Sequence, residues 1–363
     1  MRKLEKLTIE NYKSIREQTL ELGQLNVFIG GNGAGKSNLI SAFRFLREIV
    51  TQNLAAYTAT KGGADSLLYF GRKRSKTMKL RVEFCEGRNS NAYSVSLLPT
   101  ELDQLQILSE TAFFHDKAKY PNKPYDLNVS MLSAESKLKE HTHLCARQAM
   151  RDLESYRVYH FHDTSDSAPV KGTADVEDNR FLRPQADNLA PFLYWMQQKH
   201  PANYRNIVST VQQIAPFFGD FNLSPSRLNE SKIRLEWVER GSDAYLNAHA
   251  LSDGTLRFIC LTTLLMQPEL PTVLLLDEPE LGLHPAAITL LASLLSAASV
   301  RTQVLVATQS VTLVNQFRPA DVWTVERQDG TQFRHLNAAD MSQWLDSYAL
   351  GELWEMNLLG ARP

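Results

Sequence analysis

LNVFIGGNGAGKS, residues 25–37, is the stretch of this 363-residue sequence that decides its fold. The apolar run at 25–29 predicts a short buried strand, and Gly30 to Ser37 fits the pattern G-x-x-x-x-G-K-S. Glycines let backbone N–H groups turn toward an anion without a side chain in the way. The pattern therefore predicts a loop that cradles a polyphosphate.

The residues after this phosphate loop predict a helix, because apolar side chains recur there at helical spacing. These side chains are Leu39, Ile40, Phe43, Leu46, Ile49 and Val50. Strand, loop and helix together place a helix N-terminus at the anion. Lys36 would supply charge for the β- and γ-phosphates, and the Ser37 hydroxyl would complete a Mg²⁺ shell. The alternative, a glycine-rich turn that happens to precede Lys-Ser, fits the flanking pattern poorly.

A second apolar run, 271–276, ends in Asp277 and Glu278. A buried parallel strand delivers the residues at its carboxyl end to the phosphate crevice. We expect Asp277 to hold Mg²⁺ and Glu278 to orient or activate the attacking water. A strand capped by solvated acids is the alternative, and the phosphate loop makes the site the better interpretation.

Between these two motifs, Leu251-Ser-Asp-Gly-Thr255 precedes an apolar helix at 256–266. Ser252 is a good N-cap residue, and Ser and Gly at a helix N-terminus can bind an anion. The alternative is that Ser252 and Asp253 only cap a core helix. The position of the motif between the phosphate loop and the acidic strand favours an anion site.

Composition sets the broad class. Hydrophobic residues make up 43% and charged residues 22%, as in ordinary globular proteins, and the length allows one large domain or two lobes. The net charge of −1 gives no global attraction for nucleic acid. The three cysteines, Cys85, Cys145 and Cys260, are far apart, which suits a reducing cytoplasm and argues against a disulfide or zinc framework. We expect a cytoplasmic protein without a signal peptide or membrane span.

Along the chain, residues 4–29 predict short strands around a polar turn at 10–17, and 79–85 and 92–98 predict paired strands. The part from 115 to 155 is polar and gives no clear assignment. Further on we expect a strand at 158–161, a linker or mobile loop at 163–179, helices at 188–198 and 204–218, a strand at 232–240, and alternating helices and strands over 250–327.

The order of these motifs resembles the ATP-binding-cassette ATPases, and within them the branch without membrane domains: RecF, SMC-type repair ATPases and OLD-like predicted ATPases. Asn11-Tyr-Lys-Ser14, Asp277-Glu-Pro-Glu-Leu-Gly-Leu-His-Pro285 and Thr308-Gln-Ser310 carry the likeness, with Val304-Leu-Val-Ala-Thr308 as a strand. The tail from Leu350 to Gly360 is similar to stand-alone predicted ATPases of this group that lack a TOPRIM nuclease. The likeness is strong over the first fifty residues and 250–315, and only an outline between them.

The resemblance implies an ATP sandwich between two subunits, with the phosphate loop of one facing the LS-x-G of the other. Carried over by motif, Glu278 would be the catalytic base, Lys36 would bind phosphates, and Ser37 and Asp277 would hold Mg²⁺. Gln309 takes the position of the switch histidine, and His284 that of the D-loop aspartate. The residues implied to contact ATP are Gly30, Asn32, Gly33, Ala34, Gly35, Lys36, Ser37, Asn38, Ser252 and Gly254, together with Lys13 and Ser14.

The sequence departs from the cassette pattern in ways that limit the carry-over. Asp253 and Thr255 stand where transporter-type cassettes have Gly and Gln. Gln309 cannot become cationic, so sensing of the γ-phosphate by a charged imidazole is in doubt. No glutamine in 100–125 identifies itself as the Q-loop residue, although Gln104 and Gln106 lie nearby.

Two other groups of residues have open interpretations. His160 and His162 beside Asp163, and likewise His141 and His143, could bind a metal but fit the polar end of a strand better without a third ligand. A basic run could follow a DNA backbone, although such runs are more often solvated surface. Its members are Arg72, Lys73, Arg74, Lys76 and Lys79.

We therefore predict an α/β P-loop NTPase of the cassette type in a single domain, 1–363, with a mixed central sheet and two lobes. The expected parts are an N-terminal lobe at 1–162, a linker and helical subdomain at 163–250, and a lobe with LS-x-G and the acidic strand at 251–363. The predicted function is an ATPase switch that uses ATP and Mg²⁺, forms a homodimer on ATP, and acts on DNA in genome maintenance or anti-phage defence. The alternative is a nucleotide-gated scaffold that holds a separate effector protein. A transporter ATPase fits the motifs least well.

Overall fold

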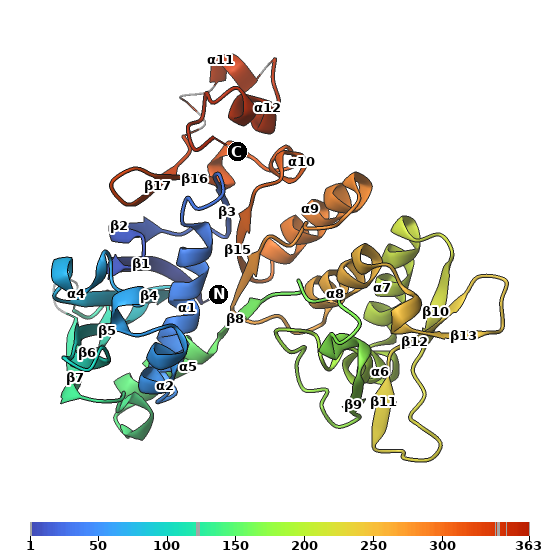
Figure 1. Ribbon diagram of the computed structural model, residues 1–363, viewed down its shortest axis with the longest axis horizontal. Coiled ribbons are helices and arrows are strands. Elements are labelled where there is room, and N and C mark those ends of the chain that lie inside the picture. Colours follow the sequence, from blue (N-terminus) through green and yellow to red (C-terminus); the bar gives the residue numbers. More distant parts are fainter. Residues whose placement is uncertain (1, 121–123, 338, 340–341, 346, 363) are drawn as a thin grey trace.

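The computed structural model describes residues 2–120, 124–337, 339, 342–345 and 347–362. The described strands form two six-stranded sheets, one three-stranded sheet and one two-stranded sheet. The two large sheets and the helix between them position the residues of the phosphate loop (Figure 1).

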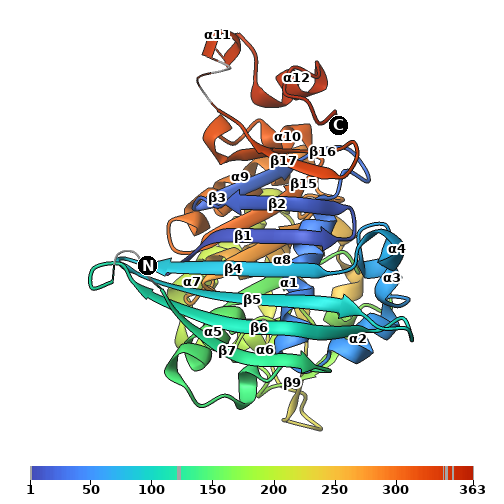
Figure 2. The same ribbon diagram turned by 90° about the vertical axis from the view of Figure 1, so that its left-hand side faces the viewer.

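The first large sheet is antiparallel, with strand order β2-β1-β4-β5-β6-β7 (Figure 2). Buried and accessible residues alternate along its strands, as expected where one face packs on a core and the other meets solvent. Its strands are β1 (Lys3–Tyr12), β2 (Ile15–Glu21), β4 (Met78–Glu86), β5 (Asn89–Pro99), β6 (Leu105–Asp116) and β7 (Tyr125–Ser133). The turn predicted at 10–17 is wrong in extent, because the two strands continue to Tyr12 and resume at Ile15.

The second large sheet is mixed, with strand order β17-β16-β3-β15-β14-β8. Only β17 runs antiparallel to its neighbour. Every residue of β3 and β15 is buried, because layers of chain cover both faces. Its strands are β3 (Leu25–Ile29), β8 (Tyr156–Tyr159), β14 (Val273–Asp277), β15 (Gln303–Thr308), β16 (Val322–Arg327) and β17 (Thr331–His335).

Helix α1 (Lys36–Val50) lies between the two large sheets and buries Phe43, Leu46 and their apolar neighbours in one core. A second core covers the other face of the mixed sheet, under α8 (Asp253–Met266) and α9 (Pro285–Ser299). The mixed α/β fold with a central mixed sheet is therefore confirmed. Because that sheet takes strands from 25–29, 156–159 and 273–335, the predicted lobe boundaries stay a prediction.

The segment 163–250, predicted as a linker and helical subdomain with a strand at 232–240, contains two helices and five short strands among its described residues. It contains α6 (Leu189–Lys199) and α7 (Pro201–Ile214); α7 packs against α8, and α6 packs against α7. It also contains the strands β9 (Thr173–Asp175), β10 (Phe218–Asn222), β11 (Lys232–Arg234), β12 (Glu236–Glu239) and β13 (Tyr245–Asn247). The single strand predicted at 232–240 is split, since β11 pairs with β9 whereas β12 pairs with β10.

The remaining helices are short and join the sheets or follow them. The α-helices are α2 (Leu54–Thr60), α3 (Ala64–Leu67), α4 (Gly71–Arg74), α5 (Leu144–Glu154), α10 (Val311–Val314), α11 (Ser342–Leu345) and α12 (Leu350–Glu355). The 3₁₀ turns are η1 (Leu138–Glu140), η2 (Pro169–Lys171), η3 (Ala248–Ala250) and η4 (Pro319–Asp321). None of the helices in the described ranges has the length and hydrophobicity that a membrane span requires.

Candidate nucleotide-binding site

The phosphate loop leaves β3 at Gly30 and enters α1 at Lys36, as the sequence predicts. Gly33 and Gly35 have φ angles of 76° and 115°, a region that other residues rarely adopt. A Cβ on Gly30 would collide with the carbonyl oxygen of Val325, and one on Gly35 would collide with the side chain of Thr331. The glycines are therefore required both by the turn and by the close approach of β16 and β17.

A chain of hydrogen bonds links the loop to the start of β17 and to the turn between β1 and β2. Asn38 Nδ2 donates to Ser14 Oγ at 2.7 Å, and Ser14 Oγ lies 2.6 Å from Thr331 Oγ1. Thr331 Oγ1 in turn donates to the carbonyl oxygen of Ala34 at 2.8 Å. Ser14 and Asn38 were predicted to contact the nucleotide, and the structure places both beside the loop. Thr331 has no motif and was missed.

Lys36 is buried, and its ammonium group donates to the carbonyl oxygens of Gly30 and Gly31. Burial lowers the pKa of Lys36, while the nearby carboxylates of Glu278 and Asp277 oppose that shift. The lysine thus lies inside the loop, on the side of the acidic strand. This is the position that a cation for β- and γ-phosphates needs.

Ser37 and Asp277 meet at the carboxyl end of the acidic strand. Ser37 Oγ donates to Asp277 Oδ1 at 3.3 Å, although the two residues are 240 positions apart in the sequence. Burial raises the pKa of Asp277, with the Ser37 hydrogen bond acting against the rise. A hydroxyl and a carboxylate oxygen suit Mg²⁺, which takes few protein ligands and completes its shell with phosphates and water. These residues therefore fit a Mg²⁺–nucleotide complex.

Glu278 follows at the point where β14 leaves the sheet. Its φ angle is 45°, an uncommon backbone conformation that costs of order 1–3 kcal/mol and often occurs at functional sites. Its N–H donates to the carbonyl of Ala307 at 2.8 Å, and its carboxylate accepts a hydrogen bond from Gln309 Nε2. Gln309 therefore orients the carboxylate that was predicted to be the catalytic base.

Glu280 is a buried acid that sequence reasoning did not single out. One oxygen accepts hydrogen bonds from the Thr308 hydroxyl and from the N–H of Gln309. The other oxygen, Oε2, has no partner among the described residues. Burial raises the pKa of Glu280. Through these bonds Glu280 fixes the turn that carries Gln309.

The segment after β8 reaches the same site from the edge of the mixed sheet. His162 Nε2 donates to the carbonyl oxygen of Asp277 at 2.8 Å, so the histidine buttresses the acidic strand. Arg257, from α8, donates to the carbonyls of Phe161 and His162 and to that of Leu281. One arginine therefore ties the helix of the LS-x-G motif to both flanks of the acidic strand.

Ser252 caps α8, accepting a hydrogen bond from the Thr255 N–H at 3.2 Å, as the capping interpretation predicts. A Cβ on Gly254 would lie 2.7 Å from the carbonyl oxygen of Gly282, so close helix packing by itself requires this glycine. Asp253 lies 4.0 Å from Lys171 of η2. Within the described residues, no hydrogen bond, ion pair or cavity joins Ser252 or Gly254 to the phosphate loop of their own chain.

The other groups singled out in the sequence have clear positions. His160 and His162 directly follow β8, and the described residues contain no cluster of three His, Cys, Asp or Glu side chains that could hold a metal. Arg72 pairs with Asp65 and Asp103, and Lys79 pairs with Glu10. The basic run is therefore partly neutralised.

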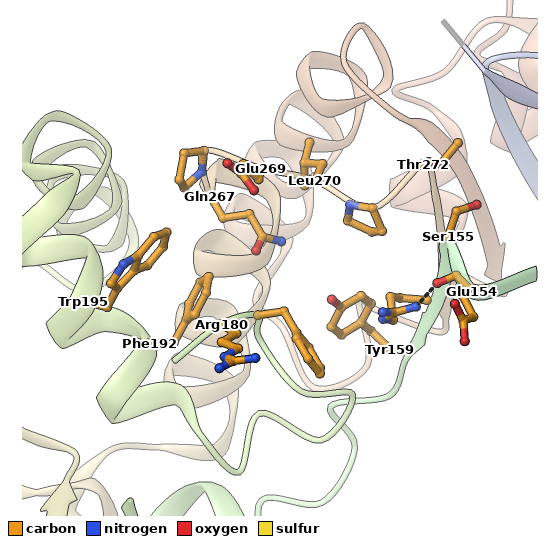
Figure 3. A pocket seen from close by; sticks show the side chains of 14 residues that line it. Glu154, Ser155, Tyr159, Arg180, Phe192, Trp195, Gln267, Glu269, Leu270 and Thr272 are labelled. Atoms are coloured by element: carbon orange, nitrogen blue, oxygen red, sulfur yellow. Dashed lines mark hydrogen bonds between the residues drawn. The ribbon is translucent and has the colours of Figure 1, made fainter. Parts of the chain in front are cut away.

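A cavity of about 330 Å³ lies away from this site, at the amino ends of β8 and β14 (Figure 3). Phe192 and Trp195 form one side, and Glu154, Ser155 and Thr272 form the other. Ligands of parallel α/β sheets bind at the carboxyl ends of the strands, where Asp277 lies. None of the predicted site residues lines this cavity, and it has no part in the nucleotide site.

A comparison with known protein families covers the same motifs. A family model described as "AAA domain, putative AbiEii toxin, Type IV TA system" matches residues 25–315, which is most of the chain and spans both the phosphate loop and the acidic strand. The chain belongs to this family. The prediction of an AAA-family ATPase is thereby confirmed at the level of the family. No curated protein sequence matches the chain.

Solved structures with a similar fold include Smc heads. An Smc head bound to the C-winged helix domain of ScpA matches with a TM-score of 0.62 at 16% identity, covering 93% of this chain and 99% of that one. The Smc head from Pyrococcus furiosus, bound to the C-terminal domain of ScpA, matches with a TM-score of 0.61 at 14% identity over 95% of this chain and 99% of that one. At these identities the likeness establishes the fold.

Proposed function

We propose that this protein is a switch driven by the binding and slow hydrolysis of Mg²⁺–ATP. The observation that carries the proposal is the meeting of Ser37 and Asp277 at 3.3 Å, directly beside Lys36 and Glu278. The phosphate loop and the acidic strand are far apart in the sequence, and a turn with only a structural role would not require their polar side chains to meet.

Each residue has a role that follows from its contacts. The loop amides and Lys36 bind the phosphates, and Ser37 and Asp277 hold Mg²⁺, which would neutralise charge on the β- and γ-phosphates. Glu278 orients the attacking water and accepts its proton, while Gln309 keeps the Glu278 carboxylate in place. Lys13 and Ser14 border the site from the turn between β1 and β2.

The switch itself would be a homodimer that closes on ATP. Ser252 is exposed at the N-terminus of α8 and makes no contact with the described phosphate loop of its own chain. A second subunit could therefore present Ser252 and Gly254 to the γ-phosphate. Dimer closure would be the two-state element that ATP biases, and the output would be conformational.

We propose a client in genome maintenance or anti-phage defence, with DNA as a partner and the cytoplasm as the location. The family description, which names a toxin of a toxin–antitoxin system, supports a defence role. The second candidate is a protein client, because the two Smc heads of similar fold are described as bound to domains of ScpA. DNA contact through the basic run at 72–79 stays a prediction.

The test is the solution mass of Glu278→Gln, measured by light scattering with and without ATP and Mg²⁺. Removing the base should trap a dimer that forms only with ATP. Lys36→Ala in the same background is the control and should remain a monomer. A Glu278→Gln protein that binds ATP as a monomer would contradict the sandwich, and wild-type hydrolysis by Glu278→Gln would contradict the assignment of the base.

A further inference from the structure

A basic cavity of about 360 Å³ runs along the accessible face of α1, next to the nucleotide site. Its walls come from the β1–β2 turn, α1, the end of α2, β8 and the segment at 181–185. Five cationic side chains line it: Lys13, Arg44, Arg47, Lys61 and Arg157. Glu48 is the one carboxylate in the lining.

None of these five cations forms an ion pair with a described residue, in contrast to the basic run, where Arg72 and Lys79 are paired. Lys13 donates to the Ser41 hydroxyl, and Arg157 donates to two backbone carbonyls. The Glu48 carboxylate is already engaged by the side-chain amide of Asn53. Five cations therefore face a single carboxylate, and the cavity carries a net positive charge.

The cations also destabilise one another. Burial lowers the pKa of Lys13, and the nearby charges of Lys61 and Arg44 lower it further. Burial and Arg47 do the same to the pKa of Arg157. An anion in the cavity would relieve both effects, because an opposite charge at short range favours the charged form.

A single ATP does not supply that anion. Its charge is confined to the triphosphate, which the phosphate loop and Mg²⁺ hold at the N-terminus of α1. Arg44 and Arg47 lie two to three turns farther along the helix, about 10–15 Å from Ser37 at 1.5 Å per residue. The uncharged nucleoside could reach the Ser41 end of the cavity, but it would leave these arginines without a partner.

We propose that this cavity binds the phosphate backbone of a single nucleic-acid strand. Aromatic rings accompany the cations, since Lys61 lies over Tyr57 at 5.3 Å and Arg157 lies over Phe181 at 5.4 Å. Phe181 is 49% exposed, which leaves ring surface for a base. Cations interleaved with accessible aromatics are typical of single-strand sites, and the volume suits one nucleotide unit and is too small for a duplex. The proposal deepens the DNA-associated role above and rests on it for the identity of the polyanion.

The test is fluorescence anisotropy of a labelled oligothymidylate, with a duplex of equal length for comparison, on the full chain without ATP. Arg44→Gln/Arg47→Gln should weaken strand binding and reduce the slope of log affinity against log salt by about 1.4, since each single-strand phosphate contact contributes about 0.7. Lys73→Gln/Lys76→Gln, with the same charge change on the basic run, should keep the wild-type slope. Lys36→Ala should also keep it, because the phosphate loop is a separate site. An unchanged thermal unfolding midpoint would show that the cavity variant is folded.

Several results would overturn the proposal. They are equal affinity of the cavity variant and the wild type, a loss of ATP affinity in place of strand affinity, and a loss of strand binding in the Lys73/Lys76 variant alone. Displacement of the strand by pyrophosphate at equal phosphate concentration would identify free phosphate as the ligand and would also overturn it. The ATP-dependent dimer of Glu278→Gln is measured without nucleic acid, so failure of the switch and failure of this cavity are distinguishable.

Discussion

Replacing Thr331 by valine should weaken ATP binding, although Thr331 lies outside every nucleotide-binding motif. The side chain is fully buried, and its hydroxyl donates to the carbonyl of Ala34 in the phosphate loop at 2.8 Å. Valine has nearly the same shape, so the substitution removes the hydrogen bonds with Ala34 and Ser14 with little change in packing. Ser14 would keep its bond from Asn38, whereas the described structure shows no other side-chain donor to Ala34.

Two hydrogen bonds of the hydroxyl are lost, and the magnitude follows from the one at the buried Ala34 carbonyl, about 1–2 kcal/mol. If that energy holds the loop in its binding conformation, the Kd for ATP should rise about 5- to 30-fold, since 1.4 kcal/mol corresponds to tenfold. Isothermal titration of ATP into Glu278→Gln and into Glu278→Gln/Thr331→Val measures the change without hydrolysis.

A matched control is available in α8. Thr262 is also fully buried, but its hydroxyl has no partner among the described residues. Thr262→Val makes the same chemical change without removing a hydrogen bond, so the Kd for ATP should stay at the wild-type value. Thr331→Ser, which retains the hydroxyl, should bind ATP nearly as well as wild type. Equal Kd values for Thr331→Val and wild type would refute the idea that the Ser14–Thr331–Ala34 chain organises the loop.

Two further predictions concern the surroundings of the site. Arg257→Gln should lower the free energy of unfolding by about 3–5 kcal/mol, because a buried charged donor to three carbonyls is lost; a melting temperature within a degree of wild type would contradict this. Burial, with His162 and Arg44, lowers the pKa of His160 from 6.5 to about 4. Between these two pKa values the unfolded chain binds more protons at His160 than the folded chain does, so the free energy of unfolding should rise with pH. Urea titrations at a series of pH values measure this rise, and His160→Asn should flatten it.

The sequence was enough to predict the parts of the site that depend on local backbone conformation and on burial. A loop that must adopt positive φ angles needs glycines, and a strand buried on both faces needs a continuous apolar run. For this reason β3, α1 and β14 lie where they were predicted. The convergence of Ser37 with Asp277 also followed, since the carboxyl ends of parallel strands share one edge of the sheet.

Other parts depend on distant partners and left no local signal. Thr331 contacts Ser14 across 317 positions of sequence, and His162 acquires its role only because β8 pairs with β14. Polar residues on the solvent-facing side of strands were wrongly predicted to form a turn, for a related reason. Glu10 and Glu17 face each other across β1 and β2, so their polarity reflects an exposed sheet face and does not mark a turn. The polar part at 115–155 similarly conceals the end of β6, all of β7 and α5.

The strand order of the mixed sheet also sets a sequence of events during synthesis. β3, which carries the phosphate loop, pairs with β15 and β16 and with no strand made before them. These partners follow about 280 residues later, which at 5–20 residues per second means roughly 15–60 s on the ribosome. The antiparallel sheet is complete once β7 has emerged at Ser133, so this half can fold early. A nascent chain would therefore complete the proposed nucleotide site only after β15 and β16 have been made, and a chain terminated before β15 would lack it.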